Sequence, residues 1–249
     1  MRSLPSISVV LPAFNEAQNL APTVNDAIET LDCLNIDYEI VIVDDGSKDG
    51  TSEVCRALAA RFNRIRIVRH PRNRGYGAAL RSGFEATRCD LVFVTDADRQ
   101  FHFDQVPEFM TLLENIDMVI GYREDRQDPW YRRFNSRIGH WFVRRVLGVP
   151  VRDANCAYKL VRRDLLRELS LEAEGAMIST ELLANGIRAG WNFREVPVRH
   201  YPRTRGKPTG TQPIVILRTI VEFIQFWRRH YLPGSNSPAL VPQIPTTTR

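Results

Sequence analysis

Short apolar runs alternate with stretches of helical spacing through the first half of this chain. The runs at residues 7–11, 39–43 and 91–95 are the clearest of these. Strands that alternate with helical patterns of about 10–15 residues are typical of βαβ units, in which the strands lie parallel in one sheet. We therefore predict an α/β fold with a mainly parallel central sheet flanked by helices.

The same periodicities predict the individual elements and their boundaries. Strands are expected at residues 7–11, 39–43, 65–68, 91–95, 118–120, 157–161 and 193–198. One helix is expected after a cap at Asn15 or Asn19, and another is expected to follow the RNRGYG stretch and to end near residue 87. Further helices are expected at residues 51–62, 130–147, 178–189 and 214–231. The chain divides into a domain over residues 1–212, a helix over 213–232, and a disordered tail rich in Pro, Ser and Thr over 233–249.

Composition and cysteine use exclude several classes of protein. A charged fraction of 25% and a hydrophobic fraction of 43% are near the globular average, which excludes global disorder. The four cysteines are scattered and predict reduced thiols in a cytoplasmic protein. We expect no signal peptide, because the first apolar stretch is short. We expect no spanning helix either, because no uncharged run reaches about 18–20 residues.

Three polar clusters follow three of the predicted strands. They are PAFNE at residues 12–16, DDGS at 44–47 and DADRQ at 96–100. Ligands of parallel α/β sheets bind beyond the carboxyl ends of the strands. The three clusters therefore predict one binding site.

The DADRQ cluster predicts a metal site. Asp96 and Asp98 come directly after a strand, where a bend in the chain turns both carboxylates toward one ligand, and Gln100 adds a neutral oxygen. Hard oxygen donors suit Mg²⁺ or Mn²⁺ bound together with a diphosphate, whose charge the ion neutralises. The alternative is a polar turn that only ends the strand, and the two neighbouring clusters favour the metal site.

The DDGS cluster predicts a nucleotide contact. The carboxylates of Asp44 and Asp45 could accept hydrogen bonds from a ribose or a base. Alternatively, Ser47 or Asp49 caps the next helix, which accounts for Asp49 but leaves the two preceding carboxylates without a role. Backbone groups of residues 12–16 could contact a base, and an arginine of residues 72–77 (RNRGYG) could reach a diphosphate.

Four blocks in this order resemble the inverting family 2 glycosyltransferases, and within them the dolichol- and polyprenyl-phosphate mannose synthases. The blocks are VVLPAFNE, IVIVDDGSKDGT, RNRGYGAALRSGF and VFVTDADRQF, and the resemblance runs through most of residues 6–210. It implies a GT-A fold with a catalytic domain over residues 1–212, a nucleotide-sugar donor, and Mg²⁺ or Mn²⁺ held by Asp96, Asp98 and Gln100. The nucleotide-sugar site would comprise Pro12, Ala13, Phe14, Glu16, Asp44, Asp45, Asp96 and Ala97.

The resemblance also implies an acceptor site in the second half of the chain. Arg123, Arg132, Ser136 and Arg203 match the family's positions for binding the acceptor phosphate. The chain departs from the family after Gly206, where Ser-Lys often follows, and Lys207 would supply that cation from another position. The catalytic residues implied in this way are Asp98, Arg123, Arg132 and Arg203.

Together these residues predict inverting transfer of a hexose to polyprenyl or dolichyl phosphate. The resemblance favours GDP-mannose as the donor, with a UDP-sugar as the alternative. A prenyl phosphate is already an oxyanion, so Glu181 would act as a base only in the rival activity, transfer to a soluble hydroxyl acceptor. A non-catalytic nucleotide-sugar-binding subunit of a membrane complex is a further alternative.

Charge divides unevenly between the two halves. Residues 1–125 contain 13 Lys and Arg against 20 Asp and Glu, whereas residues 126–249 contain 21 against 9. The acidic half holds the predicted donor-site carboxylates and the basic half holds the predicted acceptor arginines. No nucleic-acid-binding motif accompanies the basic half, so we expect no nucleic-acid partner.

The last predicted helix has two unlike faces. One stripe is polar and consists of Arg218, Glu222, Gln225 and Arg229. The rest is apolar and includes Ile214, Leu217, Ile220, Val221, Ile224, Trp227 and Tyr231. A charged residue costs about 2.5–3.5 kcal/mol at a bilayer centre, which argues against spanning. Two interpretations stay open: the helix lies in the interface at the cytoplasmic face of a membrane, or it packs on its own domain, a second copy or a membrane-anchoring protein.

Overall fold

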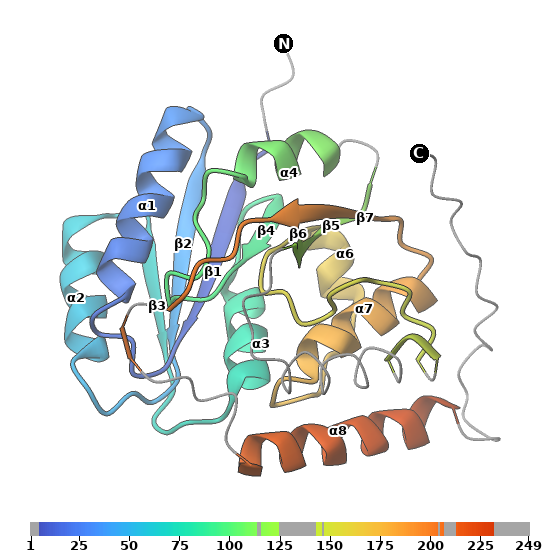
Figure 1. The fold of residues 1–249 in the computed structure, drawn as a ribbon. Helices are drawn as coiled ribbons and strands as arrows, with labels where there is room; N and C mark the ends of the chain where they lie inside the picture. Colours follow the sequence, from blue (N-terminus) through green and yellow to red (C-terminus); the bar gives the residue numbers. More distant parts are fainter. Residues whose placement is uncertain are drawn as a thin grey trace.

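The computed structural model describes residues 5–113, 116–124, 143–145, 147–203, 205–206 and 213–231. Within these residues, seven strands form one sheet in the order β3-β2-β1-β4-β6-β5-β7 (Figure 1). The first four strands pair in parallel: β1 (Ile7–Ala13), β2 (Tyr38–Asp44), β3 (Ile65–Arg69) and β4 (Leu91–Val94). The mainly parallel α/β sheet predicted from the sequence is confirmed.

The second half of the sheet mixes strand directions. β5 (Met118–Arg123) and β7 (Phe193–Val198) pair in parallel at one edge. β6 (Lys159–Arg162) lies between β4 and β5 and is antiparallel to both. The sequence predicted this strand but not its direction, because an apolar run carries no information about its neighbours in the sheet.

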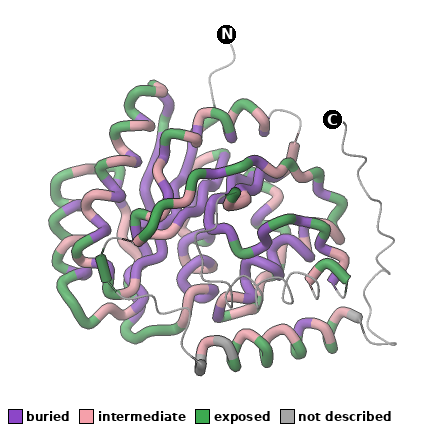
Figure 2. Tube along the Cα trace, viewed as in Figure 1, coloured by how far each residue is buried: buried purple, intermediate pink, exposed green. Residues whose placement is uncertain are grey.

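Three helices cover one face of the sheet: α1 (Leu20–Cys33), α2 (Thr51–Arg61) and α4 (Val106–Leu112). Successive side chains of a strand point to opposite faces. Within β1, Val9 packs with this layer, whereas Val10 packs on the other face, and both are fully buried. Because the central strands β1, β2 and β4 are covered on both faces (Figure 2), their sequences are apolar at most positions rather than alternating.

Among the described residues, the opposite face is covered by α3 (Tyr76–Ala86), α6 (Arg163–Glu168), α7 (Ile178–Arg188) and α8 (Pro213–Tyr231), with Val143 packed beside them. The helix α3 lies close against β1 and β2 because it carries a glycine at the contact. A Cβ on Gly83 would lie 2.4 Å from Cγ1 of Val10 and 3.2 Å from Cγ2 of Val43. Figure 1 shows α8 running along the lower side of this layer, beneath α3 and α7.

Most predicted elements agree with the structure within a few residues, but two short helices were missed. No helical pattern predicts α4 or α6, which contain seven and six residues and are too short to show a helical period. The helix predicted at residues 130–147 falls largely outside the described residues, and the predicted tail at 233–249 falls wholly outside them. None of the helices in the described ranges combines the length and apolarity needed to cross a bilayer.

Candidate active site

The predicted polar clusters meet at one edge of the sheet. Ala13 at the end of β1 pairs with Asp44 at the end of β2, and β4 and β5 run in the same direction as these strands. Because β6 runs the opposite way, its first residue, Lys159, lies at this same edge and pairs with Val94 and Ile120. Carboxylates at strand ends and a cation at a strand start are therefore brought together.

Asp96 and Asp98 follow β4 at this edge. The carboxylate of Asp98 accepts a hydrogen bond from the Gln100 backbone N–H at 3.0 Å, and Asp96 accepts one from the Tyr76 hydroxyl. Asp96 is partly exposed, but the surrounding protein desolvates its carboxylate and thereby raises its pKa to about 7. The negative charge of the neighbouring Asp98 adds to this rise. Burial likewise raises the pKa of Asp98.

This pair of carboxylates fits a divalent cation. Both groups are poorly solvated and they repel each other, so a dication between them would relieve both costs. Among the described residues, no three His, Cys, Asp or Glu side chains gather into a metal cage. An ion held by two carboxylates would thus take its remaining ligands from oxygens of a bound diphosphate, water or Gln100.

Gln100 joins this cluster to the loop that follows β7. Its side-chain Nε2 donates to the Tyr201 carbonyl at 3.2 Å, and the Tyr201 N–H donates to the Gln100 carbonyl at 2.9 Å. Residues more than a hundred positions apart are held side by side by these two bonds. The metal-ligand role of Gln100 stays a prediction.

Arg203 lies among carboxylates of the predicted donor side. Its Nη2 donates to Glu16, its Nη1 lies 3.5 Å from Oδ2 of Asp98, and its Nε donates to the Arg205 carbonyl at 2.7 Å. Gly206 has a φ of +77°, and a Cβ there would lie 2.8 Å from Nη2 of Arg203. The guanidinium is therefore closely held, with only 16% of its side chain exposed.

Asp44 is fully buried and remains ionised. Burial alone would raise its pKa, but hydrogen bonds from the Ser52 hydroxyl and from the Ser47 side chain and backbone lower it below its ordinary value. The Ser47 backbone bond measures 3.0 Å. Asp49 accepts the Thr51 N–H at 2.9 Å at the start of α2, where Gly50 rather than Asp49 occupies the N-cap position.

Asp45 has structural partners for both carboxylate oxygens. It accepts the backbone N–H groups of Arg74 and Gly75 at 2.9 Å each, and its Oδ1 lies 2.6 Å from Nδ1 of the buried His70. Nε2 of His70 lies 2.9 Å from the Ser82 hydroxyl on α3. The chain Asp45–His70–Ser82 thus holds the 72–75 loop at the sheet edge, a role that the sequence interpretation of Asp45 did not include.

The remaining predicted donor-site residues differ in what they can offer a ligand. Pro12 and Ala13 lie within β1 and are buried, and Ala97 is only 2% exposed in the core. These three residues can present backbone groups at most, whereas Phe14 is partly exposed at the edge. The carboxylate of Glu16 bonds to Asn19 at 2.7 Å as well as to Arg203.

On the predicted acceptor side, Arg123 ends β5. Its Nε and Nη2 bind the carboxylate of Asp153 at 2.7 and 3.1 Å, a bidentate pair that fixes the plane of the guanidinium. Lys159 is 3% exposed, donates to the Cys156 carbonyl, and lies close enough to Asp96 for their charges to interact. Burial lowers the pKa of Lys159. Arg132, Ser136 and Lys207 lie outside the described residues.

Glu181 is placed away from this edge. Its carboxylate accepts the backbone N–H groups of Glu172 and Ala173 at 2.9 and 2.8 Å, and it lines a separate cavity of about 320 Å³ between the 172–177 segment and α8. A carboxylate engaged in this way stabilises the loop. The geometry does not favour the conditional role of general base that the sequence left open.

Two site residues were missed in the sequence. Tyr76 bonds to Asp96, and His70 anchors Asp45. Their only local signal is position: His70 follows a strand, and Tyr76 stands between Gly75 and Gly77 at the start of a helix. Neither position specifies a partner that is 20 to 25 residues distant in the chain.

The fold and the strand-end site agree with the comparisons with known proteins. A model of "Glycosyl transferase family 2" matches residues 8–170, so the chain belongs to this family. Its curated relatives include the undecaprenyl-phosphate 4-deoxy-4-formamido-L-arabinose transferase of Edwardsiella ictaluri, 32% identical over 83% of this chain and 63% of the relative. The dodecaprenyl-phosphate galacturonate synthase of Rhizobium johnstonii is 29% identical over 80% of this chain and 60% of the relative.

Solved structures show the same architecture. Glucosyl-3-phosphoglycerate synthase from Mycobacterium tuberculosis, in complex with Mn²⁺, UDP and phosphoglyceric acid, superimposes with a TM-score of 0.71. It is 25% identical, and the match covers 93% of this chain and 80% of that chain. The GT-A fold implied by the resemblance is thereby confirmed. This chain spans less than two thirds of the length of the curated relatives named above.

Proposed function

We propose that this protein is an inverting glycosyltransferase that moves a sugar from a nucleotide-sugar donor to a polyprenyl phosphate. The observation that carries the proposal is the meeting of Asp96 and Asp98 with Arg123 and Arg203 at one edge of the sheet. Carboxylates suit a metal-bound diphosphate, and arginines suit an anionic acceptor. The relatives support the acceptor class, because both of their names contain a prenyl phosphate.

The proposed reaction needs alignment more than proton transfer. An oxygen of the acceptor phosphate attacks the anomeric carbon of the sugar opposite the leaving group. The new carbon–oxygen bond forms as the bond to the donor diphosphate breaks, and the nucleoside diphosphate departs with the electron pair. Because the phosphate is already an oxyanion, the tasks of Arg123 and Arg203 are to hold it in line and to balance its charge.

The donor side would bind the nucleotide sugar. Asp96 and Asp98, with Gln100, would hold Mg²⁺ or Mn²⁺, which when bound neutralises charge on the leaving diphosphate. Tyr76 would orient Asp96 through its hydroxyl. Phe14 is the partly exposed side chain available for a nucleotide base, and the ionised Asp44 is buried close by at the end of β2.

The donor is proposed as a class. The sequence resemblance favours GDP-mannose, whereas the named relatives handle 4-deoxy-4-formamido-L-arabinose and galacturonate, and a structural neighbour contains UDP. GDP-mannose and UDP-sugars are therefore tested together. We further propose that the reaction occurs at the cytoplasmic face of a membrane, to which the protein binds peripherally, directly or through an anchoring protein.

A transfer assay tests the proposal. The purified full chain is given Mn²⁺, a short-chain prenyl phosphate and, in separate reactions, GDP-mannose, UDP-glucose and UDP-galacturonate. We expect transfer from one donor and a loss of about 100-fold in Asp98→Asn, which keeps the shape of the side chain but removes its charge. Asp104→Asn is the matched control, because Asp104 is exposed and its carboxylate pairs with Arg199 rather than with a residue of the proposed site.

Two outcomes would contradict the proposal. Transfer to a soluble hydroxyl acceptor such as 3-phosphoglycerate, with none to prenyl phosphate, would favour the rival activity. Binding of a nucleotide sugar without transfer to any acceptor would favour a non-catalytic subunit.

A further inference from the structure

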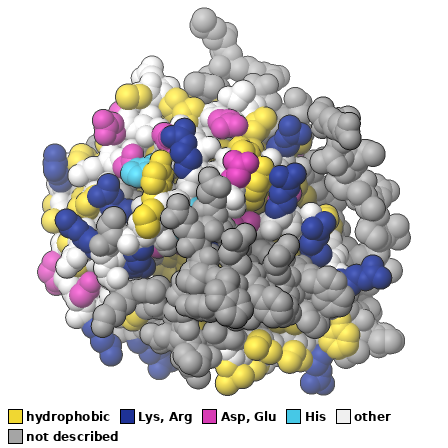
Figure 3. All heavy atoms as spheres, viewed as in Figure 1, with side chains coloured by type: hydrophobic (Ala, Val, Ile, Leu, Met, Phe, Trp, Pro, Cys, Tyr) yellow, Lys and Arg dark blue, Asp and Glu magenta, His cyan; other side chains and the backbone are white. Residues whose placement is uncertain are grey.

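The outer face of α8 carries an exposed apolar ridge. It consists of Leu217, Ile220, Val221 and Ile224, whose exposed fractions range from 44% to 58%. Their spacing of three, four and seven residues puts all four on one side of the helix. In Figure 3, hydrophobic side chains gather along the lower edge of the molecule, where α8 lies. We call these four residues the α8 ridge.

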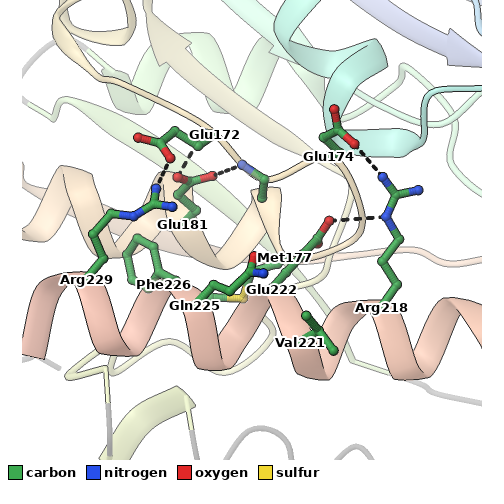
Figure 4. Close-up of a pocket in the computed structure, with 11 residues that line it drawn as sticks. Glu172, Glu174, Met177, Glu181, Arg218, Val221, Glu222, Gln225, Phe226 and Arg229 are labelled. Atoms are coloured by element: carbon green, nitrogen blue, oxygen red, sulfur yellow. Dashed lines mark hydrogen bonds and ion pairs between the residues drawn. The ribbon is translucent and has the colours of Figure 1, made fainter.

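The polar stripe of α8 lies along the 172–177 segment. Arg218 donates a hydrogen bond to Glu174 at 2.6 Å, and Arg229 forms an ion pair with Glu172. Figure 4 shows both arginines reaching from α8 to the 172–177 segment. Glu222 accepts the Gly175 N–H at 2.8 Å. A surface helix ordinarily turns its apolar stripe to the core and its charges to water. In α8 the face that contains Phe223, Phe226 and Trp227 packs on the core in this way, and the ion pairs lie on its flank, so the ridge is a second apolar face that is turned outward.

The charge beside the ridge is basic. Arg228 follows Ile224 by four residues, so it extends the same face, and it is exposed. It forms no ion pair with any residue in the described ranges. Arg229 and Arg188 lie near His230 in the last turn of α8, and burial together with these two arginines lowers the pKa of His230, so the imidazole is neutral at pH 7. An apolar ridge that ends in the exposed guanidinium group of Arg228 complements the acyl boundary and the phosphates of an anionic bilayer.

The helix is also tied to the candidate active site. Nη1 of Arg218 lies 3.4 Å from the position that a Cβ on Gly75 would occupy. The Glu174 carbonyl accepts the Gly77 N–H at 2.8 Å, and Tyr76 between these glycines bonds to Asp96. The surface on which the ridge lies is thus connected to the metal-site carboxylate by a short series of direct contacts.

We propose that the α8 ridge lies in the interface of an anionic lipid bilayer, with Arg228 among the lipid phosphates. This inference rests on the proposed function and names its docking surface. A prenyl phosphate carries its phosphate at the level of the lipid headgroups. A helix lying at that level would keep the strand-end arginines near the acceptor, whose chain stays in the bilayer.

Vesicle flotation tests the proposal. The full chain is mixed with vesicles of phosphatidylcholine and phosphatidylglycerol in a 7:3 ratio, and with vesicles of phosphatidylcholine alone. We expect the wild type to float with the anionic vesicles, and the triple variant Leu217→Ser, Ile220→Ser, Ile224→Ser to lose at least about tenfold in binding. The matched control, Leu217→Ile, Ile220→Leu, Ile224→Leu, keeps the ridge apolar and should bind as the wild type does. Arg228→Gln should weaken binding to the anionic vesicles alone.

The ridge side chains are exposed, so the serine variant should fold, which circular dichroism and its melting temperature would verify. Its transfer to a short-chain prenyl phosphate without vesicles should equal that of the wild type, and this keeps the proposed function separable from the docking surface. Equal flotation of the wild type and the serine variant would overturn the inference. A wild-type dimer that the serine variant converts to a monomer would overturn it too, in favour of a second copy as the occupant.

Discussion

Nη1 of Arg203 lies 3.5 Å from Oδ2 of Asp98, while the same guanidinium donates to Glu16. A cation of the predicted acceptor side is therefore bound to carboxylates of the predicted donor side. Arg203 and a dication at Asp98 would repel each other, so occupation of the metal site should release the arginine toward an acceptor phosphate.

We predict that Arg203→Ala binds Mn²⁺ more tightly in the absence of substrates, by about tenfold, which corresponds to about 1.4 kcal/mol. Its transfer to prenyl phosphate should fall by about 100-fold, because the acceptor loses a bidentate partner. Electron paramagnetic resonance of free Mn²⁺ measures the first effect and steady-state kinetics the second. Arg199→Ala, at an exposed arginine paired with Asp104, is the control. Unchanged Mn²⁺ affinity in Arg203→Ala would contradict the competition.

The bond between His70 and Asp45 supports the second prediction. His70→Ala should lower the free energy of unfolding by about 2 kcal/mol, because it removes a buried hydrogen bond to Oδ1 of Asp45, which then keeps the Arg74 N–H, and also removes the contact with the Ser82 hydroxyl. It should also raise KM for the donor through loosening of the 72–75 loop. His70→Asn keeps a donor near Nδ1 and should recover part of both losses. Urea denaturation and donor kinetics measure the effects, and an alanine variant as stable as the wild type would exclude the role.

The pKa of Asp96 supports a prediction about pH. Burial and Asp98 raise this pKa from its ordinary value of 3.8 to about 7, so the metal-free folded state retains a proton that the unfolded state has lost. This contribution to stability is present below about pH 4 and is lost as the pH rises through 7. We expect Mn²⁺ to displace close to one proton from Asp96 at pH 6 and little at pH 8.

Calorimetric titration of Mn²⁺ in two buffers with different ionisation enthalpies measures this proton release. The rise in melting temperature caused by Mn²⁺ should also be larger at pH 8 than at pH 6. Asp96→Asn should abolish the difference in proton release. Equal proton release at the two pH values in the wild type would show that Asp96 is not the group that titrates.

The contact of α3 with the sheet supports a prediction about stability. Gly83→Ala would place its Cβ 2.4 Å from Val10, and neither the strand nor the helix can withdraw without loss of packing. We expect a loss of about 1–3 kcal/mol in the free energy of unfolding, measured in urea. Gly50→Ala is the control, because its Cβ would lie 3.6 Å from the Ala17 Cβ, an ordinary contact. A Gly83→Ala protein as stable as this control would contradict the packing argument.

The strands and the sheet edge that carries the site were predictable from the sequence. Parallel strands buried on both faces are apolar over most of their length, as in residues 40–43, and the clusters at the ends of β1, β2 and β4 are the polar turns that end them. The position of Asp96 and Asp98 at the carboxyl edge follows from the parallel direction alone. The strands and this edge of the sheet are therefore predictable without knowledge of any side-chain contact.

Long-range partners were not predictable in this way. Arg203 and Glu16 are separated by 187 positions, and nothing local to either residue specifies the other. The sequence showed that α8 has two faces, but periodicity does not say which face meets the domain. The packing of Phe226 in the core and the ion pairs to Glu172 and Glu174 decide this, and the two glutamates belong to a segment without a helical or strand period.

The antiparallel course of β6 bears on how kinetic results from this protein are interpreted. Among the described strands, β4 of the donor side and β5 of the acceptor side are joined through β6, and Lys159 pairs with a residue of each. A substitution in β6 disturbs both substrates' sites through one shared strand. Changes in donor KM and acceptor KM caused by such a variant would be correlated, and neither could be assigned to a single substrate.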